Sequence, residues 1–216
     1  MTGGPQTTTA DATTTAEART GGTQRSQAKE LRRKALLAAA AGLFAENGYS
    51  KVSLEELGAA AGVSGPAVYR HFPGKQAVLG ELLLSVSRDL LSGGRDVVSG
   101  AADAREALRG LVRFHVHFAL SNPDVIRVQD RDFSSLTEAD QAEVRSLQRS
   151  YVETWVEVLG DIHKETDPTE LRVRAHAAFG LINSTPHSVR HHGRKIAVKS
   201  ARPILEQMAL AALTST

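Results

Sequence analysis

The chain has 216 residues, a formal net charge of +2 at pH 7, 41% hydrophobic residues and no cysteine. That length and apolar content suit one medium domain, or a small domain fused to a larger one. The lack of cysteine excludes disulfides, thiolate metal sites and cysteine nucleophiles, and the small net charge means that any nucleic-acid contact must come from a local patch. Because no apolar run reaches membrane-spanning length and the N-terminus has no apolar signal core, we expect a soluble, cytoplasmic protein without a membrane partner.

Residues 1–27 are expected to form a disordered tail. The stretch up to about residue 24 is rich in Thr, Gly, Ala and Gln, and it cannot bury enough surface to offset the entropy of ordering. A basic cluster follows, formed by Arg25, Lys29, Arg32, Arg33 and Lys34. A solvated charge run is the ordinary interpretation of such a cluster. Its position beside the segment described next makes phosphate contact by Arg33 a hypothesis.

Three helices are expected between residues 28 and 72, and the first covers residues 28–47. Its apolar residues recur on one face, and Asn47-Gly48 is a normal helix end. The second helix begins at Ser53, a good N-cap, and Glu56 three residues later completes a capping-box pattern. It ends at Gly62, which can adopt the positive φ that closes a helix.

The third helix is short and runs from Ser64, its N-cap, to Phe72, which precedes a proline. At about 100° per residue its buried face carries Val68 and Phe72. Its opposite face carries Pro66, Tyr69 and Arg70, flanked by Ala67 and His71. Arginine can bind guanine O6 and N7 through two hydrogen bonds, tyrosine and histidine can reach phosphate oxygens, and a helix fits the major groove. A surface helix of any bundle is the alternative, but the caps, turn glycine, core positions and polar face all favour DNA binding.

Several short runs in this region are typical of one family. They are AENGY at residues 45–49, VSLEEL at 52–57, AGVS at 61–64, VYRHF at 68–72 and GK at 74–75. They resemble the DNA-binding domain of the TetR (tetracycline-repressor) family of bacterial transcription regulators over about residues 30–80. The resemblance implies phosphate contacts by Ser53, Tyr69, His71 and Lys75, and base-facing positions at Gly65, Pro66, Ala67 and Arg70. Ser64 and Arg33 complete the set of candidate DNA contacts.

The base-facing surface of this helix is poor in polar side chains. Pro66 and Ala67 replace the small polar residues that are commoner at these positions of the family, and neither carries a side-chain donor. Base reading would then depend on Arg70, on methyl contacts and on DNA shape.

Beyond Lys75 the sequence predicts helices throughout. We expect them from residue 75 to Gly93-Gly94, and at residues 103–120, 123–133, 137–163, 167–183 and 200–213, with His187–Lys195 as a connection. No strand alternation and no internal repeat is found. The predicted fold class is all-α, with a three-helix, helix-turn-helix DNA-binding domain at residues 28–75. Residues 76–216 are expected to form a helical ligand-binding and dimerisation domain.

The last two helices are strongly apolar and carry small residues that allow close approach, namely Ala175, Ala178, Ala209 and Ala212. An intramolecular core would also explain this composition. In the family that the chain resembles, the pair forms a four-helix bundle with its twin, and an inverted-repeat operator requires a twofold dimer. We therefore expect a homodimer that binds palindromic double-stranded DNA.

A small-molecule pocket is expected between the C-terminal helices, with apolar walls and a few polar groups. The candidates are Phe114, His115, Phe118, Arg127, Arg131, Tyr151, Trp155, His176, Phe179 and Asn183. Each of them alone is more often a core residue than a ligand contact. Members of the family generally release DNA when a small molecule binds there. Residues 179–188 resemble actinobacterial members linked to acyl-coenzyme A metabolism, so the expected effector is an acyl-coenzyme A or another apolar metabolite.

Catalysis, metal binding and a cofactor are not expected. Ser184, His187 and Asp161 are catalytic-triad residue types, but no nucleophile elbow surrounds Ser184. His187, His191 and His192 lack a partner at a recognised metal-ligand spacing. The favoured function is a ligand-responsive transcriptional regulator, with repression as its mode. An activator, a DNA-binding protein without a ligand, and a metal-responsive sensor stay open as alternatives.

Overall fold

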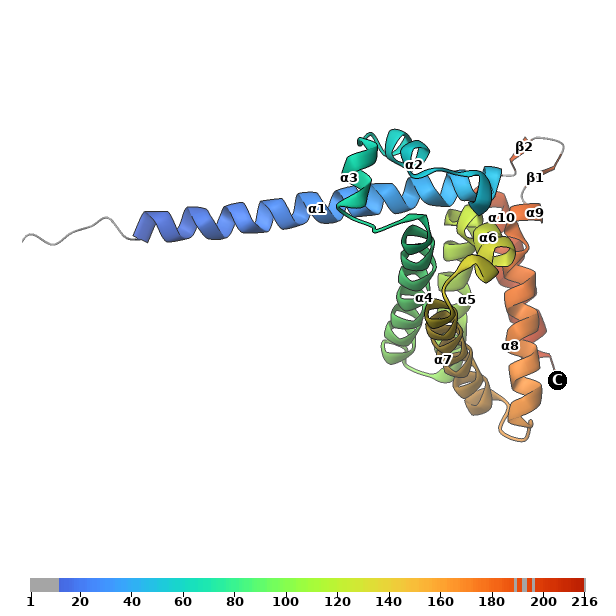
Figure 1. Cartoon of the computed structure of the whole chain (residues 1–216). Helices are drawn as coiled ribbons and strands as arrows, with labels where there is room; N and C mark the ends of the chain where they lie inside the picture. The colour runs from blue at the N-terminus through green and yellow to red at the C-terminus, as the bar shows by residue number, and fades with distance from the viewer. Residues whose placement is uncertain (1–11, 189, 192–193, 196, 216) are drawn as a thin grey trace, which may run out of the picture.

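The computed structural model describes residues 12–188, 190–191, 194–195 and 197–215, and this part of the chain is helical apart from one small hairpin (Figure 1). The all-α prediction is therefore confirmed. No helix in the described part is both long and apolar enough to cross a membrane. The elements in chain order are α1 (Ala12–Asn47), η1 (Tyr49–Lys51), α2 (Leu54–Ala60), α3 (Gly65–Tyr69), α4 (Lys75–Ser99), α5 (Ala104–Ser121), α6 (Pro123–Asp132), η2 (Phe133–Ser135), α7 (Glu138–Ile162), α8 (Pro168–Asn183), α9 (Thr185–Ser188), β1 (Arg190–His191), β2 (Arg194–Lys195) and α10 (Val198–Thr214).

The first helix is longer than the sequence predicts. It begins at Ala12 rather than at residue 28, so residues 12–27 continue the helix where a disordered tail was expected. The alanine, glutamate, arginine and glutamine residues of this stretch are strong helix formers, a signal that its threonines and glycines conceal. Residues 1–11 of the predicted tail lie outside the described residues. In Figure 1 the first part of α1 projects away from the rest of the molecule.

The predicted helix-turn-helix unit is formed by α2 and α3, packed on the C-terminal part of α1. The Ser53 hydroxyl accepts a hydrogen bond from the Glu56 backbone N–H at 3.2 Å, and the Glu56 carboxylate accepts one from the Ser53 backbone N–H at 2.7 Å. This confirms the capping box. Gly62 has a φ of +70°, which closes α2 as predicted. Val68 and Phe72 are buried beneath α3.

The helix α4 belongs to two cores. Val78 and Leu79 in its first turns pack with α1, α2 and α3, and the same core includes Val128 of α6 and Val144 of α7. Its later turns pack on α5 and α7. The core of the helix-turn-helix unit is therefore continuous with helices that follow Lys75, where the sequence places a domain boundary.

Contrary to the prediction, α4 does not end at Gly93-Gly94 but continues to Ser99. These two glycines allow close packing instead of ending the helix. The Phe114 ring lies against Gly93, and a Cβ added at Gly94 would lie 2.5 Å from the Tyr151 ring. A glycine pair late in a helical pattern is a normal end signal, but here neighbouring aromatic rings take the space.

The larger bundle contains the later part of α4 together with α5, α7, α8 and α10 (Figure 1). Its core includes the fully buried Leu111, Trp155 and Ile182. The short helix α6 lies between this bundle and α1, and it packs extensively on α1. The predicted connection before α10 contains a hairpin whose two strands, β1 and β2, have two residues each, and in which Arg190 pairs with Lys195.

Candidate DNA-binding surface and ligand cavity

The outer face of α3 carries most of the residues that were predicted to meet DNA. Tyr69 keeps 56% of its surface exposed, and Pro66 and Arg70 are also exposed. Gly65 and Ala67 are half-buried. No hydrogen bond or ion pair occupies the Arg70 guanidinium within the described part of the chain. The face therefore offers a free guanidinium and a free phenol, as the helical periodicity predicts.

His71 lies among cations at the end of α3. Burial lowers the pKa of this imidazole, and nearby positive charges lower it further, from Lys29, Arg33, Arg32 and Arg70. Its Nδ1 is buried without a hydrogen-bond partner among the described residues. This concentration of positive charge beside α3 favours a bound anion such as a DNA phosphate.

Arg33, a predicted phosphate contact, has partners inside the protein. Its guanidinium lies 3.1 Å from the Glu81 carboxylate, donates to the His71 carbonyl at 3.1 Å, and stacks 4.5 Å above the Phe72 ring. It thereby joins α1 and α4 to the segment that follows α3. These contacts hold the Arg33 side chain against the helix-turn-helix unit, and the exposed Lys29 lies on the same helix.

The other predicted phosphate contacts lie at helix starts. Lys75 begins α4, donates to the Ser50 carbonyl at 3.2 Å, and lies 4.6 Å from the Tyr49 ring centroid. An ammonium has three donors, so one internal bond leaves two for an oxygen outside the protein. Ser53 is the α2 cap described above. Ser64 precedes α3, and its side chain makes no capping hydrogen bond.

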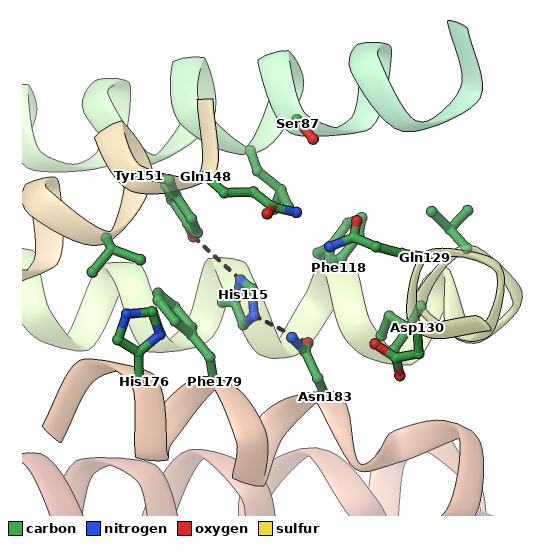
Figure 2. A pocket seen from close by; sticks show the side chains of 14 residues that line it. Ser87, His115, Phe118, Gln129, Asp130, Gln148, Tyr151, His176, Phe179 and Asn183 are labelled. Carbon is green, nitrogen blue, oxygen red and sulfur yellow. Dashed lines mark hydrogen bonds between the residues drawn. The ribbon is translucent and has the colours of Figure 1, made fainter. Parts of the chain in front are cut away.

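A cavity of about 180 Å³ lies among α4, α5, α6, α7 and α8 (Figure 2). Its wall combines apolar and aromatic side chains with several polar groups, as ligand sites in helix bundles do. The lining residues are Ser87, Leu90, His115, Phe118, Val125, Ile126, Gln129, Asp130, Gln148, Tyr151, Val152, His176, Phe179 and Asn183.

The predicted pocket residues divide into two groups. Those that line the cavity are His115, Phe118, Tyr151, His176, Phe179 and Asn183. Trp155 is fully buried behind the wall, with its ring centroid 4.9 Å from that of Phe179. Phe114 packs on Gly93 of α4 instead. Two predicted residues from α6, Arg127 and Arg131, also lie outside the cavity.

Both α6 arginines bind main-chain carbonyls of neighbouring elements. Arg127 donates to the Pro186 carbonyl at 3.1 Å and to Asp124 at 3.0 Å. Arg131 donates to the carbonyls of Phe44 and Ala45, the latter at 3.3 Å. The structure thus places both side chains away from the cavity wall, and helical periodicity alone does not tell which side of α6 faces the bundle.

Arg131 forms a clamp on the C-terminal end of α1. The last carbonyls of a helix lack intrahelical partners and carry a partial negative charge, which a guanidinium satisfies. The same guanidinium donates a hydrogen bond to the Asp132 carboxylate at 2.9 Å, and this bond raises the pKa of Arg131. On its other side α6 contributes Ile126 and Gln129 to the cavity wall. This short helix therefore connects the cavity with the first helix of the DNA-binding unit.

A chain of hydrogen bonds crosses the inner wall of the cavity (Figure 2). Burial lowers the pKa of His115 to about 4, although the hydrogen bond that His115 donates to Asn183 opposes this shift. Burial also raises the pKa of Tyr151. Both groups are therefore neutral at pH 7. Tyr151 then donates to His115 Nδ1 at 3.3 Å, and His115 Nε2–H donates to Asn183 Oδ1 at 3.2 Å. In this tautomer, which carries its proton on Nε2, each of the two hydrogen bonds has one donor and one acceptor.

Sequence reasoning missed the amides of Gln129 and Gln148 and the hydroxyl of Ser87. A spacing signal existed for Gln148, because it lies three residues before Tyr151 and so shares its helix face. Ser87 gave no signal, since its hydroxyl is buried and donates to the Leu83 carbonyl of its own helix at 2.7 Å.

Comparison with known proteins gives matches over both parts of the chain. Residues 36–82 match the family described as "Bacterial regulatory proteins, tetR family". Residues 101–212, more than half of the chain, match the family described as "Tetracyclin repressor-like, C-terminal domain". The first matched segment contains α3, and the second contains 12 of the 14 residues that line the cavity.

Two curated relatives share part of the sequence. The chain is 33% identical over 90 residues to the HTH-type transcriptional activator FasR of Mycolicibacterium smegmatis. This match covers 42% of this chain and 41% of FasR. It is 27% identical over 132 residues to the HTH-type transcriptional repressor KstR2 of Rhodococcus jostii. This second match covers 61% of this chain and 65% of KstR2. The match thus spans less than two thirds of either relative.

Solved structures share the fold. A TetR-family transcriptional regulator from Bordetella parapertussis superposes with a TM-score of 0.71 at 22% identity, over 82% of this chain and 93% of that one. AibR, crystallised in complex with isovaleryl coenzyme A and operator DNA, superposes with a TM-score of 0.66 at 20% identity. This superposition covers 82% of this chain and 97% of AibR. At these identities the likeness extends to the fold alone.

Proposed function

Because this chain belongs to the TetR family of DNA-binding transcriptional regulators, a family without enzymatic activity, we propose that it is a ligand-responsive repressor. It binds a palindromic operator as a homodimer and releases it when a small molecule enters the cavity. The observation that carries this proposal is that α6 contacts both the cavity and the first helix of the DNA-binding unit. One side of α6 lines the cavity, and Arg131 on the other side holds the end of α1.

Repression is favoured by the direction of this coupling. A ligand that displaces α6 would disturb the end of α1; α2 packs on α1, and α3 packs on α2. Such a disturbance lowers DNA affinity, and loss of DNA on ligand binding is the behaviour of an inducible repressor. The relatives include an activator, FasR, and a repressor, KstR2. Activation is therefore the second candidate mode.

A homodimer is supported by apolar side chains left uncovered on α8 and α10. Val173, Ile204 and Met208 are each more than half exposed. Ala175 and Ala209, small residues expected at a dimer contact, are instead buried within the single chain. The exposed residues are the ones that a twin subunit would cover, since contiguous exposed apolar residues mark interaction sites.

For the effector we propose an apolar metabolite of modest size. AibR is similar in fold and has been crystallised with isovaleryl coenzyme A, so an acyl-coenzyme A is the alternative. A cavity of about 180 Å³ suits the smaller molecule better. A metal effector has less support, because no group of three or more His, Asp or Glu residues gathers in the described part of the chain.

Selection from randomised duplex DNA tests the proposed function. We expect enrichment of an inverted repeat whose half-sites lie about 34–36 Å apart or at a multiple of that spacing. Placing the selected duplex upstream of a reporter then distinguishes the two modes, since a repressor lowers transcription. Enrichment of no inverted repeat would refute the proposal.

A further inference from the structure

We propose that the cavity binds a compact, uncharged molecule that carries one or two hydrogen-bonding groups, and that it discriminates against anions. The proposal rests on the proposed function only in taking this cavity as the effector site. Four features of the wall carry it: the missing cation, the neutral inner histidine, the free amides and the volume.

The cavity offers no fixed positive charge. None of the 14 lining residues is lysine or arginine. The α6 arginines that the sequence assigns to the pocket bind elsewhere, Arg127 to Asp124 and the Pro186 carbonyl, and Arg131 to the end of α1. An anion that enters the cavity would lose its hydration without gaining a paired cation, which is strongly unfavourable.

The histidines of the wall do not replace that cation. His115 is 3% exposed, and both of its ring nitrogens are occupied by Tyr151 and Asn183. Protonation would break its bond from Tyr151, since a protonated imidazole has no acceptor. His176 is exposed to solvent, which screens any charge it carries. Asp130 lines the same cavity at its exposed edge and is a carboxylate, so it supplies no cation either.

The wall does offer neutral hydrogen-bonding groups. Gln129 of α6 and Gln148 of α7 point into the same space beside His115 (Figure 2). Neither amide has a hydrogen-bond partner among the residues that the structure describes. Asn183 accepts from His115 and keeps its amide donors. Amides both donate and accept, so the three groups match a hydroxyl, carbonyl or amide of an uncharged ligand.

The volume limits the ligand to about one ring with a small substituent. An apolar cavity of about 150 Å³ is known to hold benzene, and this cavity measures about 180 Å³. Aromatic walls from Phe118 and Phe179 suit a ring. A molecule that bears a nucleotide would leave its phosphates outside the cavity.

Three probes of one shape test the proposal, namely benzamide, benzoate and benzylamine, which at pH 7 are neutral, anionic and cationic. Binding is followed by the fluorescence of Trp155, the single tryptophan of the chain, whose ring lies 4.9 Å from Phe179 of the wall. We expect benzamide to bind at least about tenfold more tightly than benzoate. Benzoate binding as tightly as benzamide, benzylamine binding most tightly, or no probe binding would each overturn the proposal.

A pair of variants locates the site. Gln148→Lys introduces a cation into the wall, and Gln148→Met has a similar volume without charge or amide. We expect benzoate to bind the lysine variant at least about tenfold more tightly than the methionine variant. Equal benzoate affinity in the two variants would place binding elsewhere and overturn the proposal.

Binding to the selected operator duplex is measured on the same protein samples. Intact operator binding without any binding of the three probes would refute the ligand class alone. Failure of the wild-type protein to bind operator DNA would refute the regulator function instead. The two failures are therefore distinguishable.

Discussion

The fold strongly changes the acid–base chemistry of His115. Its pKa of about 4 lies below the ordinary value of 6.5, so the unfolded chain binds a proton at pH 5 that the folded protein does not. The contribution of the neutral His115 to stability is then fully present above pH 6.5 and is lost as the pH falls toward 4. We expect the free energy of unfolding to drop by about 2 kcal/mol between pH 7 and pH 5 from this residue. Urea denaturation at the two pH values measures the drop.

The matched variant for this prediction is His115→Gln. Glutamine can still hydrogen-bond to Asn183 but does not titrate, while the other seven histidines of the chain's eight are unchanged. Its loss of stability between pH 7 and pH 5 should be smaller than that of the wild-type protein by about the same 2 kcal/mol. Equal losses would show that His115 does not titrate as the structure indicates.

Arg70 and Lys75 are expected to affect DNA binding in different ways. Arg70 is exposed and unpaired on α3, so Arg70→Ala should relax base preference at one position of each half-site by about 1–3 kcal/mol. Lys75→Ala should weaken binding to all sequences and make the salt slope shallower by about one unit. Selection on randomised DNA and salt titrations measure these effects. Unchanged base preference in Arg70→Ala, or an unaltered slope in Lys75→Ala, would count against the assigned role.

At the scale of elements, the packing of α4 depends on its glycines. Gly94→Ala places a Cβ 2.5 Å from the Tyr151 ring, and such overpacking costs about 1–3 kcal/mol. Gly42→Ala is the control, because nothing lies within 4 Å of its Cβ inside α1. Alanine favours a helix over glycine by about 1 kcal/mol, so the control should be more stable than wild type. Thermal denaturation that ranks the two variants in the reverse order would refute this view of α4.

Local chemistry explains which elements the sequence could predict. Asp103, Thr137 and Asp167 each accept a hydrogen bond that begins a helix, and the helices predicted from residues 103, 137 and 167 begin there. The role of Gly94 depends on a ring from a distant helix, which no local pattern records. The same holds for α6, whose arginines face α1 and α9 rather than the cavity. On α5, α7 and α8 the sequence predicted the cavity-facing positions of His115, Tyr151 and Phe179, but it placed Phe114 in the cavity although that ring packs on Gly93.

At the scale of the whole molecule, the exposed apolar face of α8 and α10 predicts a dimer. Met208→Glu together with Ile204→Glu should give monomers and weaken operator binding, since one subunit then contacts only one half-site. Light scattering after size-exclusion chromatography measures the mass. Leu31→Gln is the control, because Leu31 is apolar and even more exposed but lies on α1. A dimeric double glutamate variant would show that another surface holds the subunits together.

The joint between α6 and α1 predicts how the two sites communicate. Arg131→Ala removes the guanidinium from the carbonyls of Phe44 and Ala45 without changing the cavity wall or α3. We expect it to retain binding of benzamide and of operator DNA but to lose most of the coupling between them. Allosteric coupling typically amounts to about 5–150-fold in affinity, which we expect for DNA binding by the wild type, and we expect less than about twofold for the variant.

Arg127→Ala is the matched control for that loss of coupling. It removes a guanidinium from the same helix, but one whose partners are Asp124 and the Pro186 carbonyl rather than α1. Operator affinity is measured with and without saturating benzamide for both variants. Coupling that survives Arg131→Ala but disappears in Arg127→Ala would mean that the signal passes through α9 instead. Loss in Arg131→Ala alone would identify the end of α1 as the point where occupation of the cavity reaches the DNA-binding unit.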